Sequence, residues 1–170
     1  MIFSKAEYLS RLAKVKKSMD QKNMDVIILT DPSNMHYLTG YDGWSFYVPQ
    51  GIIVALDLDE PIWFGRRQDS KGAKVTTYLQ DKNIIYYPED LIQSPPTHPY
   101  DFVSSFIHEN NWANKNIGVE MDAYYYTAEN HYRLTSTCPN VNFTDATLLV
   151  NWIRLIKSEN EINYMKEGSK

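Results

Sequence analysis

Apolar residues near the N-terminus recur every three or four positions, and farther along the chain they form short unbroken runs. The positions at helical spacing are Tyr8, Leu12, Val15 and Met19. Ser4 and Glu7 form a capping box, so an amphipathic helix is predicted from Ser4 to near Asn23. Residues 24–30 are an aliphatic run ended by an Asp-Pro pair, which is typical of a strand buried on both faces.

Strand-like runs alternate with amphipathic segments along the rest of the chain. Further strands are predicted at residues 51–56, 61–64, 83–87, 117–120 and 141–143. Helices are predicted at residues 68–79, 100–111, 123–134 and 146–153. The acidic segment 57–60 favours a hairpin between the first two of these strands. The expected fold is therefore α/β, a mixed sheet of about six strands with helices on both faces.

A second capping box lies close to the end of the sequence. Ser158 and Glu161 start another helix, and Ile162 and Met165 give that helix an apolar stripe with nothing downstream to pack on. We therefore expect residues 1–153 to form one domain. Residues 154–170 are expected to be a linker and the start of a helix that leads into a C-terminal catalytic domain absent from this chain.

Residues 31–49 break the alternation of helix and strand. We predict a long loop there, and its aromatic residues are Tyr37, Tyr41, Trp44, Phe46 and Tyr47. Aromatic side chains on a loop are costly unless they cover something. The loop could cover a ligand, or it could only plug the domain's own core.

Composition and charge narrow the possible partners and the compartment. The net charge is −4, and the 17 Lys and Arg residues are scattered, which argues against nucleic acid or an anionic membrane as a partner. The single cysteine, Cys138, excludes an internal disulfide and suits a reducing compartment. No signal-peptide core or membrane-length apolar run is visible, so we expect a cytoplasmic protein.

The sequence offers no obvious catalytic or metal-binding motif. The histidines, which show no short metal-ligand spacing, are His36, His98, His108 and His131. No glycine-rich phosphate loop follows a predicted strand, and Cys138 is best explained as a buried or idle thiol. We therefore predict no catalytic residue and no metal ligand within the chain.

Charged residues beside two predicted strands have both functional and structural explanations. Glu120 and Asp122 end a strand, where α/β proteins often place functional groups. We favour a simpler interpretation in which Asp122 caps the following helix and Glu120 binds nearby backbone or an arginine. Arg66 and Arg67 could clamp a carboxylate, but such arginines more often form surface ion pairs.

Several of these segments resemble one known family. The segment 154–162 has an arginine, then Lys-Ser, then Glu-Ile, and it resembles the linker that leads into the catalytic domain of creatinase/prolidase (aminopeptidase P-like) metallohydrolases. The order of elements resembles the N-terminal domain of the same family. Within the family, segments 31–48, 118–122 and 145–152 are most similar to ectoine hydrolases.

The resemblance implies a fold and a role. It implies a non-catalytic N-terminal domain with a ribonuclease H-like motif, which covers the active site and supports a homodimer. The missing catalytic domain would hold two divalent metal ions (Mn, Co or Zn) and hydrolyse a C–N bond of a small molecule. The parent protein would be an ectoine hydrolase or a Xaa-Pro dipeptidase-like enzyme.

The resemblance also implies a set of site residues, which would contact the substrate across the dimer. These residues are Trp44, Phe46, Tyr47 and His36. Creatinase-like members place an arginine just after the equivalent phenylalanine to hold a substrate carboxylate. This chain has Val48 there, which counts against a creatine-type substrate.

Two alternatives to an active-site cover stay open at this point. The chain could be a stand-alone module that binds small molecules in a pocket of the aromatic loop. It could also be a purely structural dimerisation domain whose aromatic residues anchor an interface. Titration of the isolated chain with ectoine-like solutes separates a binding module from the other two hypotheses. Mutating the loop in the full protein separates an active-site cover from a purely structural domain.

Overall fold

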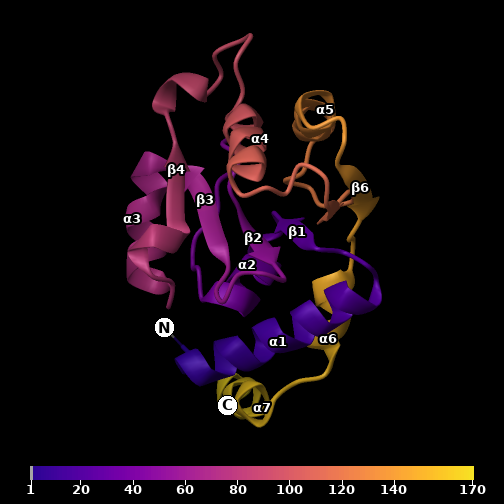
Figure 1. Cartoon of the computed structure of the whole chain (residues 1–170). Helices are drawn as coiled ribbons and strands as arrows, with labels where there is room; N and C mark the ends of the chain where they lie inside the picture. The colour runs from indigo at the N-terminus through magenta and orange to yellow at the C-terminus, as the bar shows by residue number, and fades with distance from the viewer. Residues whose placement is uncertain (1) are drawn as a thin grey trace.

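A mixed sheet of six strands crosses the domain in the order β4-β3-β2-β1-β5-β6 (Figure 1). The computed structural model describes residues 2–170. The strands are β1 (Val26–Leu29), β2 (Gly51–Ala55), β3 (Ile62–Arg66), β4 (Ile84–Tyr87), β5 (Asn116–Val119) and β6 (Asn142–Asp145). β2 pairs antiparallel with β1 and β3, whereas β1 with β5, β3 with β4 and β5 with β6 are parallel. The predicted mixed sheet and its one adjacent hairpin are confirmed.

Helices cover both faces of this sheet, as predicted. They are α1 (Lys5–Gln21), α2 (Pro32–Thr39), α3 (Arg67–Thr76), α4 (Pro99–Glu109), α5 (Ala128–Thr137), α6 (Leu149–Leu155) and α7 (Glu159–Gly168), with 3-10 turns η1 (Asp81–Asn83) and η2 (Glu89–Leu91). Alternate residues of β1 divide between two hydrophobic clusters. Ile27 and Leu29 pack with α1, α2 and α6, and Val26 and Ile28 pack with α4 and α5. Burial on both faces explains why β1 is an unbroken aliphatic run.

The prediction that residues 31–49 form one long loop is wrong, because α2 occupies the first half of that segment. Asp31 caps this helix: its carboxylate accepts hydrogen bonds from the N–H groups of Ser33 (2.8 Å) and Asn34 (3.2 Å). A proline occupies the first turn, and Gly40 ends the helix in the left-handed region at φ 80°. The sequence carries these start and stop signals, but a helix of only eight residues shows little periodicity.

The helix predicted at residues 123–134 begins later, and its cap is a different residue. Residues 121–126 form turns, and α5 starts after Thr127, whose hydroxyl accepts a hydrogen bond from Asn130 N–H at 3.3 Å. Asp122 therefore does not cap this helix, contrary to our expectation. The turn segment keeps Tyr124 on the surface instead of within a helix.

A buried arginine joins the first and last helices of the described chain. Arg11 lies within 3.4 Å of Glu7 and 3.3 Å of Glu161, and its guanidinium also donates a hydrogen bond to the Tyr37 carbonyl. The Phe3 ring stacks on the same guanidinium at 4.0 Å. These contacts hold α7 against the start of α1 (Figure 1).

Glu120, just after β5, is the other polar centre of the fold. Its carboxylate accepts hydrogen bonds from Thr30 N–H (2.7 Å), Asp31 N–H (2.9 Å) and the Asn34 amide (2.6 Å). Burial raises the pKa of Glu120, and the hydrogen bonds that it accepts offset part of that rise. The expectation that Glu120 binds nearby backbone is confirmed.

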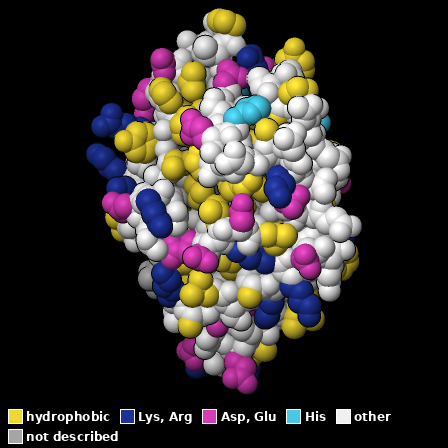
Figure 2. All heavy atoms as spheres, viewed as in Figure 1, with side chains coloured by type: hydrophobic (Ala, Val, Ile, Leu, Met, Phe, Trp, Pro, Cys, Tyr) yellow, Lys and Arg dark blue, Asp and Glu magenta, His cyan; other side chains and the backbone are white. Residues whose placement is uncertain are grey.

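The surface of the described chain carries mixed charge, and none of its helices is suited to cross a membrane. Figure 2 shows acidic and basic side chains intermingled over the visible face, as the scatter of these residues along the sequence predicted. Among residues 2–170, no helix is long and apolar enough to cross a bilayer.

We expect Glu120→Ala to destabilise the domain by about 3 kcal/mol, because it leaves one buried and one partly buried backbone N–H group without an acceptor. Urea unfolding measures this change. Asp122→Ala is the matched control: its carboxylate makes no hydrogen bond within the described chain, so we expect a change of at most about 0.5 kcal/mol. Equal stability of the two variants would show that Glu120 does not anchor this region.

Candidate functional site

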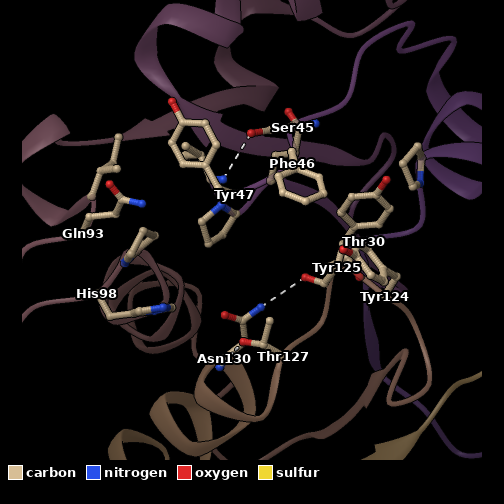
Figure 3. A pocket seen from close by; sticks show the side chains of 16 residues that line it. Thr30, Ser45, Phe46, Tyr47, Gln93, His98, Tyr124, Tyr125, Thr127 and Asn130 are labelled. Atoms are coloured by element: carbon tan, nitrogen blue, oxygen red, sulfur yellow. Dashed lines mark hydrogen bonds between the residues drawn. The ribbon is translucent and has the colours of Figure 1, made fainter.

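A cavity of about 250 Å³ lies between the end of β1, the segment 45–50, the start of α4 and the turn before α5 (Figure 3). Thr30 follows β1 directly, and Thr127 and Asn130 belong to the start of α5. Four segments far apart in sequence therefore meet at the carboxyl end of a parallel strand pair. Open α/β sheets commonly bind ligands at this end.

The aromatic residues of segment 31–49 divide into a buried and an exposed set. Tyr37 and Tyr41 are buried in the core. Trp44, Phe46 and Tyr47 are 61%, 66% and 61% exposed. Core packing, one of the two explanations that the sequence allowed, therefore applies to Tyr37 and Tyr41. Trp44, Phe46 and Tyr47 are at the surface, where they are available to cover a ligand.

The exposed aromatic residues form one side of the cavity. Phe46 and Tyr47 line it, and Trp44 lies at its rim, with ring centroids 6.4 Å from Phe46 and 6.5 Å from Tyr125. Tyr124 lies across from Phe46 at 6.4 Å. The structure thus brings three of the four predicted site residues together.

His36, the fourth predicted residue, lies on α2 and is not among the residues that line the cavity. It is half-buried, and burial lowers its pKa, with Asp42 acting in the opposite direction. Its proposed contact with substrate stays a prediction. His98, for which the sequence predicts no role, does line the cavity.

The start of α4 fixes the tautomer of the neutral His98 ring. Its Nδ1 accepts a hydrogen bond from Tyr100 N–H at 3.1 Å, so a neutral ring carries its proton on Nε2. Burial lowers the pKa of His98, and Arg133 lowers it further. Both effects favour a neutral imidazole at pH 7.

Sequence reasoning missed the residues that complete the cavity, which are Thr30, Tyr124, Tyr125 and Asn130. The run of three tyrosines at positions 124–126 is a usable signal, but it falls inside the helix that the sequence predicts at residues 123–134. Thr30 and Asn130 carry no sequence signal of their own. They become significant only because the fold brings them together.

The remaining candidates have structural explanations. Arg66 forms an ion pair with Asp69 at 3.0 Å, as expected. Cys138 is buried, as expected, and burial raises the pKa of its thiol, although the fold places His108 Nε2 3.6 Å from the sulfur. A high thiol pKa suppresses the thiolate, which is the reactive form.

The donor set of residues 2–170 does not fit a metal. No group of three or more His, Cys, Asp or Glu side chains there is arranged to hold an ion. The chemistry that the cavity supports is binding, through aromatic faces and a few polar atoms.

Comparison with known proteins identifies relatives over nearly the whole chain. A hydrolase/peptidase of Sinorhizobium fredii is 50% identical over 98% of this chain, and the ectoine hydrolase of Halomonas elongata is 44% identical over 99%. The chain spans only 42% of the length of each of these relatives.

Solved structures share the fold at low sequence identity. The Xaa-Pro dipeptidase from Bacillus anthracis superposes with a TM-score of 0.72 at 17% identity, covering 94% of this chain and 39% of that one. The N-terminal domain of the peptidase PepQ from Mycobacterium tuberculosis superposes with a TM-score of 0.63 at 16% identity, covering 85% and 98%.

A family model decides the assignment. The model of the creatinase/prolidase N-terminal domain matches residues 11–156, which is most of the chain. The resemblance inferred from the linker and the aromatic segment is thereby confirmed. The chain belongs to the creatinase/prolidase N-terminal domain family.

Proposed function

We propose that this chain is the non-catalytic N-terminal domain of a longer, metal-dependent C–N hydrolase, in which it covers the active site and supports dimerisation. The family assignment and the greater length of the relatives support this role. The 44% identity with an ectoine hydrolase favours that activity for the parent, and a Xaa-Pro dipeptidase-like activity is the second choice.

The exposed aromatic residues are the observation that carries the proposal. Trp44, Phe46 and Tyr47 each leave more than half of their surface in water, although the same segment buries Tyr37 and Tyr41. Grouped exposed aromatic side chains mark interaction sites in soluble proteins. Here these side chains border a cavity. At that position they can contact a small molecule in the cavity and also another subunit.

A second exposed surface supports contact with the rest of the parent. Apolar side chains exposed on α6, α7 and their linker include Trp152, Leu155, Ile156, Ile162 and Met165. Arg11 and Glu161 fix the direction of α7, and so the position of this surface. We propose that residues 1–153 are the covering domain and that 154–170 lead into a catalytic domain packed against this surface.

The aromatic loop suits the chemistry of an ectoine-like substrate. Ectoine is a small zwitterionic cyclic amidine, so its delocalised cation can stack on Trp44, Phe46 and Tyr47 from a partner subunit. His36 or an arginine of the catalytic domain would meet the carboxylate. Two divalent metal ions, Mn, Co or Zn, would activate water in that catalytic domain, and the protein would act in the cytoplasm.

We expect Trp44→Ala in the full-length enzyme to raise KM or lower kcat by about tenfold, which corresponds to losing about 1.4 kcal/mol of binding energy. The melting temperature should hardly change, because Trp44 is exposed. Tyr132→Ala, an equally exposed aromatic residue on α5, is the control and should keep normal kinetics. Early unfolding of the Trp44 variant with normal kinetics would assign the loop to packing.

Metal dependence of the parent is tested by chelation. We expect the full-length enzyme to lose C–N hydrolase activity on dialysis against a chelator and to regain it with Mn, Co or Zn. The isolated chain should hydrolyse nothing under the same conditions. Turnover by the isolated chain would contradict a non-catalytic role for this domain. A parent enzyme that stays fully active with the chelator would contradict metal dependence.

A further inference from the structure

The helix α7 lies outside the hydrophobic core of the domain. Figure 1 shows it on the side of α1 that faces away from the sheet. None of its residues is buried, whereas the preceding α6 places Leu149 and Val150 in the core. A helix of ten residues is marginally stable in water by itself, so contacts outside the core must hold α7 in place.

Polar contacts with the N-terminal segment hold this helix. Glu161 Oε1 lies 3.3 Å from the Arg11 guanidinium. The Asn160 amide donates a hydrogen bond to Glu7 (3.1 Å), and the Tyr164 hydroxyl donates one to a backbone carbonyl just before α1 (3.0 Å). We refer to these interactions together as the α1–α7 contact.

The apolar side chains of α7 take no part in this contact. Ile162 and Met165 are 40% and 62% exposed, and with the linker they line an open groove of about 500 Å³. Positions three and four apart share a helix face, so the polar residues at 160, 161 and 164 occupy one side of α7 and these two apolar residues another. The aromatic part of the contact is an edge-to-face pair, Phe3 and Tyr164, at 5.2 Å. The contact therefore depends mainly on charge and hydrogen bonds.

Arg11 keeps other partners if α7 moves away. Its guanidinium also lies 3.4 Å from Glu7 on the same helix and donates a hydrogen bond to the Tyr37 carbonyl at 3.1 Å. The Phe3 and Tyr37 rings stack on it at 4.0 Å and 4.6 Å. A buried charge left without a partner is strongly destabilising, and Glu7 prevents that outcome. Separation of α7 therefore costs only the α1–α7 contact itself.

The connection between α6 and α7 is free to bend. Ile156 has an extended backbone (φ −86°, ψ 106°), its side chain is 77% exposed, and Lys157 is exposed beside it. Rotation of the backbone at these positions displaces no buried side chain. Hinges are commonly a few residues at the end of a helix or strand that absorb such rotations.

We propose that residues 156–158 are a hinge and that the ion pair between Arg11 and Glu161 is the charge-dependent contact that closes it, so that α7 leaves α1 while the sheet domain stays folded. Elements that move are drawn from the parts of a protein with low local stability. The inference rests on the proposed function only for what α7 carries, namely the catalytic domain of the parent. In that protein the closed contact sets the angle between the catalytic domain and the aromatic loop.

Salt tests the proposal on this chain. Raising NaCl from about 0.01 M to about 1 M shortens the screening length from about 30 Å to about 3 Å, which weakens charge pairs that solvent can reach. We expect amide hydrogen exchange of α7, followed by NMR, to become about fivefold faster over this range, while exchange of α6 and β1 hardly changes. Exchange of α7 that is as slow as that of α6, or that does not respond to salt, overturns the proposal.

Two substitutions at the start of α7 isolate the ion pair. Glu161→Gln removes the charge that faces Arg11 and keeps an oxygen that can accept from the Ser158 N–H in the capping box. We expect α7 exchange about fivefold faster than in the wild type at low salt, with little further effect of salt. Glu159→Gln is the matched control, because Glu159 is an exposed carboxylate in the same first turn, and it should respond to salt as the wild type does. Equal behaviour of the two variants would overturn the role of the ion pair.

The same variants test what the hinge does in the full-length parent. We expect Glu161→Gln to raise KM by about threefold or more at low salt, because the aromatic loop is then held less firmly over the active site, and Glu159→Gln to keep KM normal. An unchanged KM for Glu161→Gln would overturn the link between the hinge and substrate binding. Exchange of α7 needs no catalytic domain. Salt-dependent α7 exchange with normal kinetics of Trp44→Ala therefore defeats only the covering role, and the reverse pattern defeats only the hinge.

Discussion

The buried carboxylate of Glu120 is the contact on which the candidate site depends. It joins the end of β5 to the end of β1 through two backbone N–H groups and holds the start of α2 through Asn34. Asn34 in turn accepts a hydrogen bond from Arg154 at 2.8 Å, so the linker region is tied to the same centre. Because α2 leads directly into the aromatic loop, the position of Trp44 follows from this network. A buried carboxyl group is tolerated there because three donors hydrogen-bond to it.

Local patterns in the sequence were sufficient for most of the architecture. The helical spacing of apolar residues located α1, and the aliphatic run at 24–30 located β1, because each element is buried in a regular way. The mixed sheet followed from the short acidic turn at 57–60. Hydrophobic periodicity did not predict the eight-residue α2, because a helix of two turns shows little of it. The Asp-Pro start and the Gly40 end of this helix are nevertheless recognisable signals in the sequence.

The cavity could not be predicted in the same way. Thr30, His98 and Asn130 lie far apart in the sequence, and only the strand order places their segments side by side. The aromatic loop was visible from sequence because a cluster of large rings is unusual in itself, whereas a threonine and an asparagine are not.

The most direct test of the account is a subunit-mixing measurement on the full-length parent, because a loop that acts across a dimer can be rescued by its partner. One variant carries Trp44→Ala with an intact catalytic domain, and the other carries a normal loop with a catalytic domain that cannot bind metal. Random mixing gives half of the dimers one complete site, so the account predicts recovery to about one quarter of wild-type activity. Activity that stays at the level of the separate variants would contradict a covering role across the dimer.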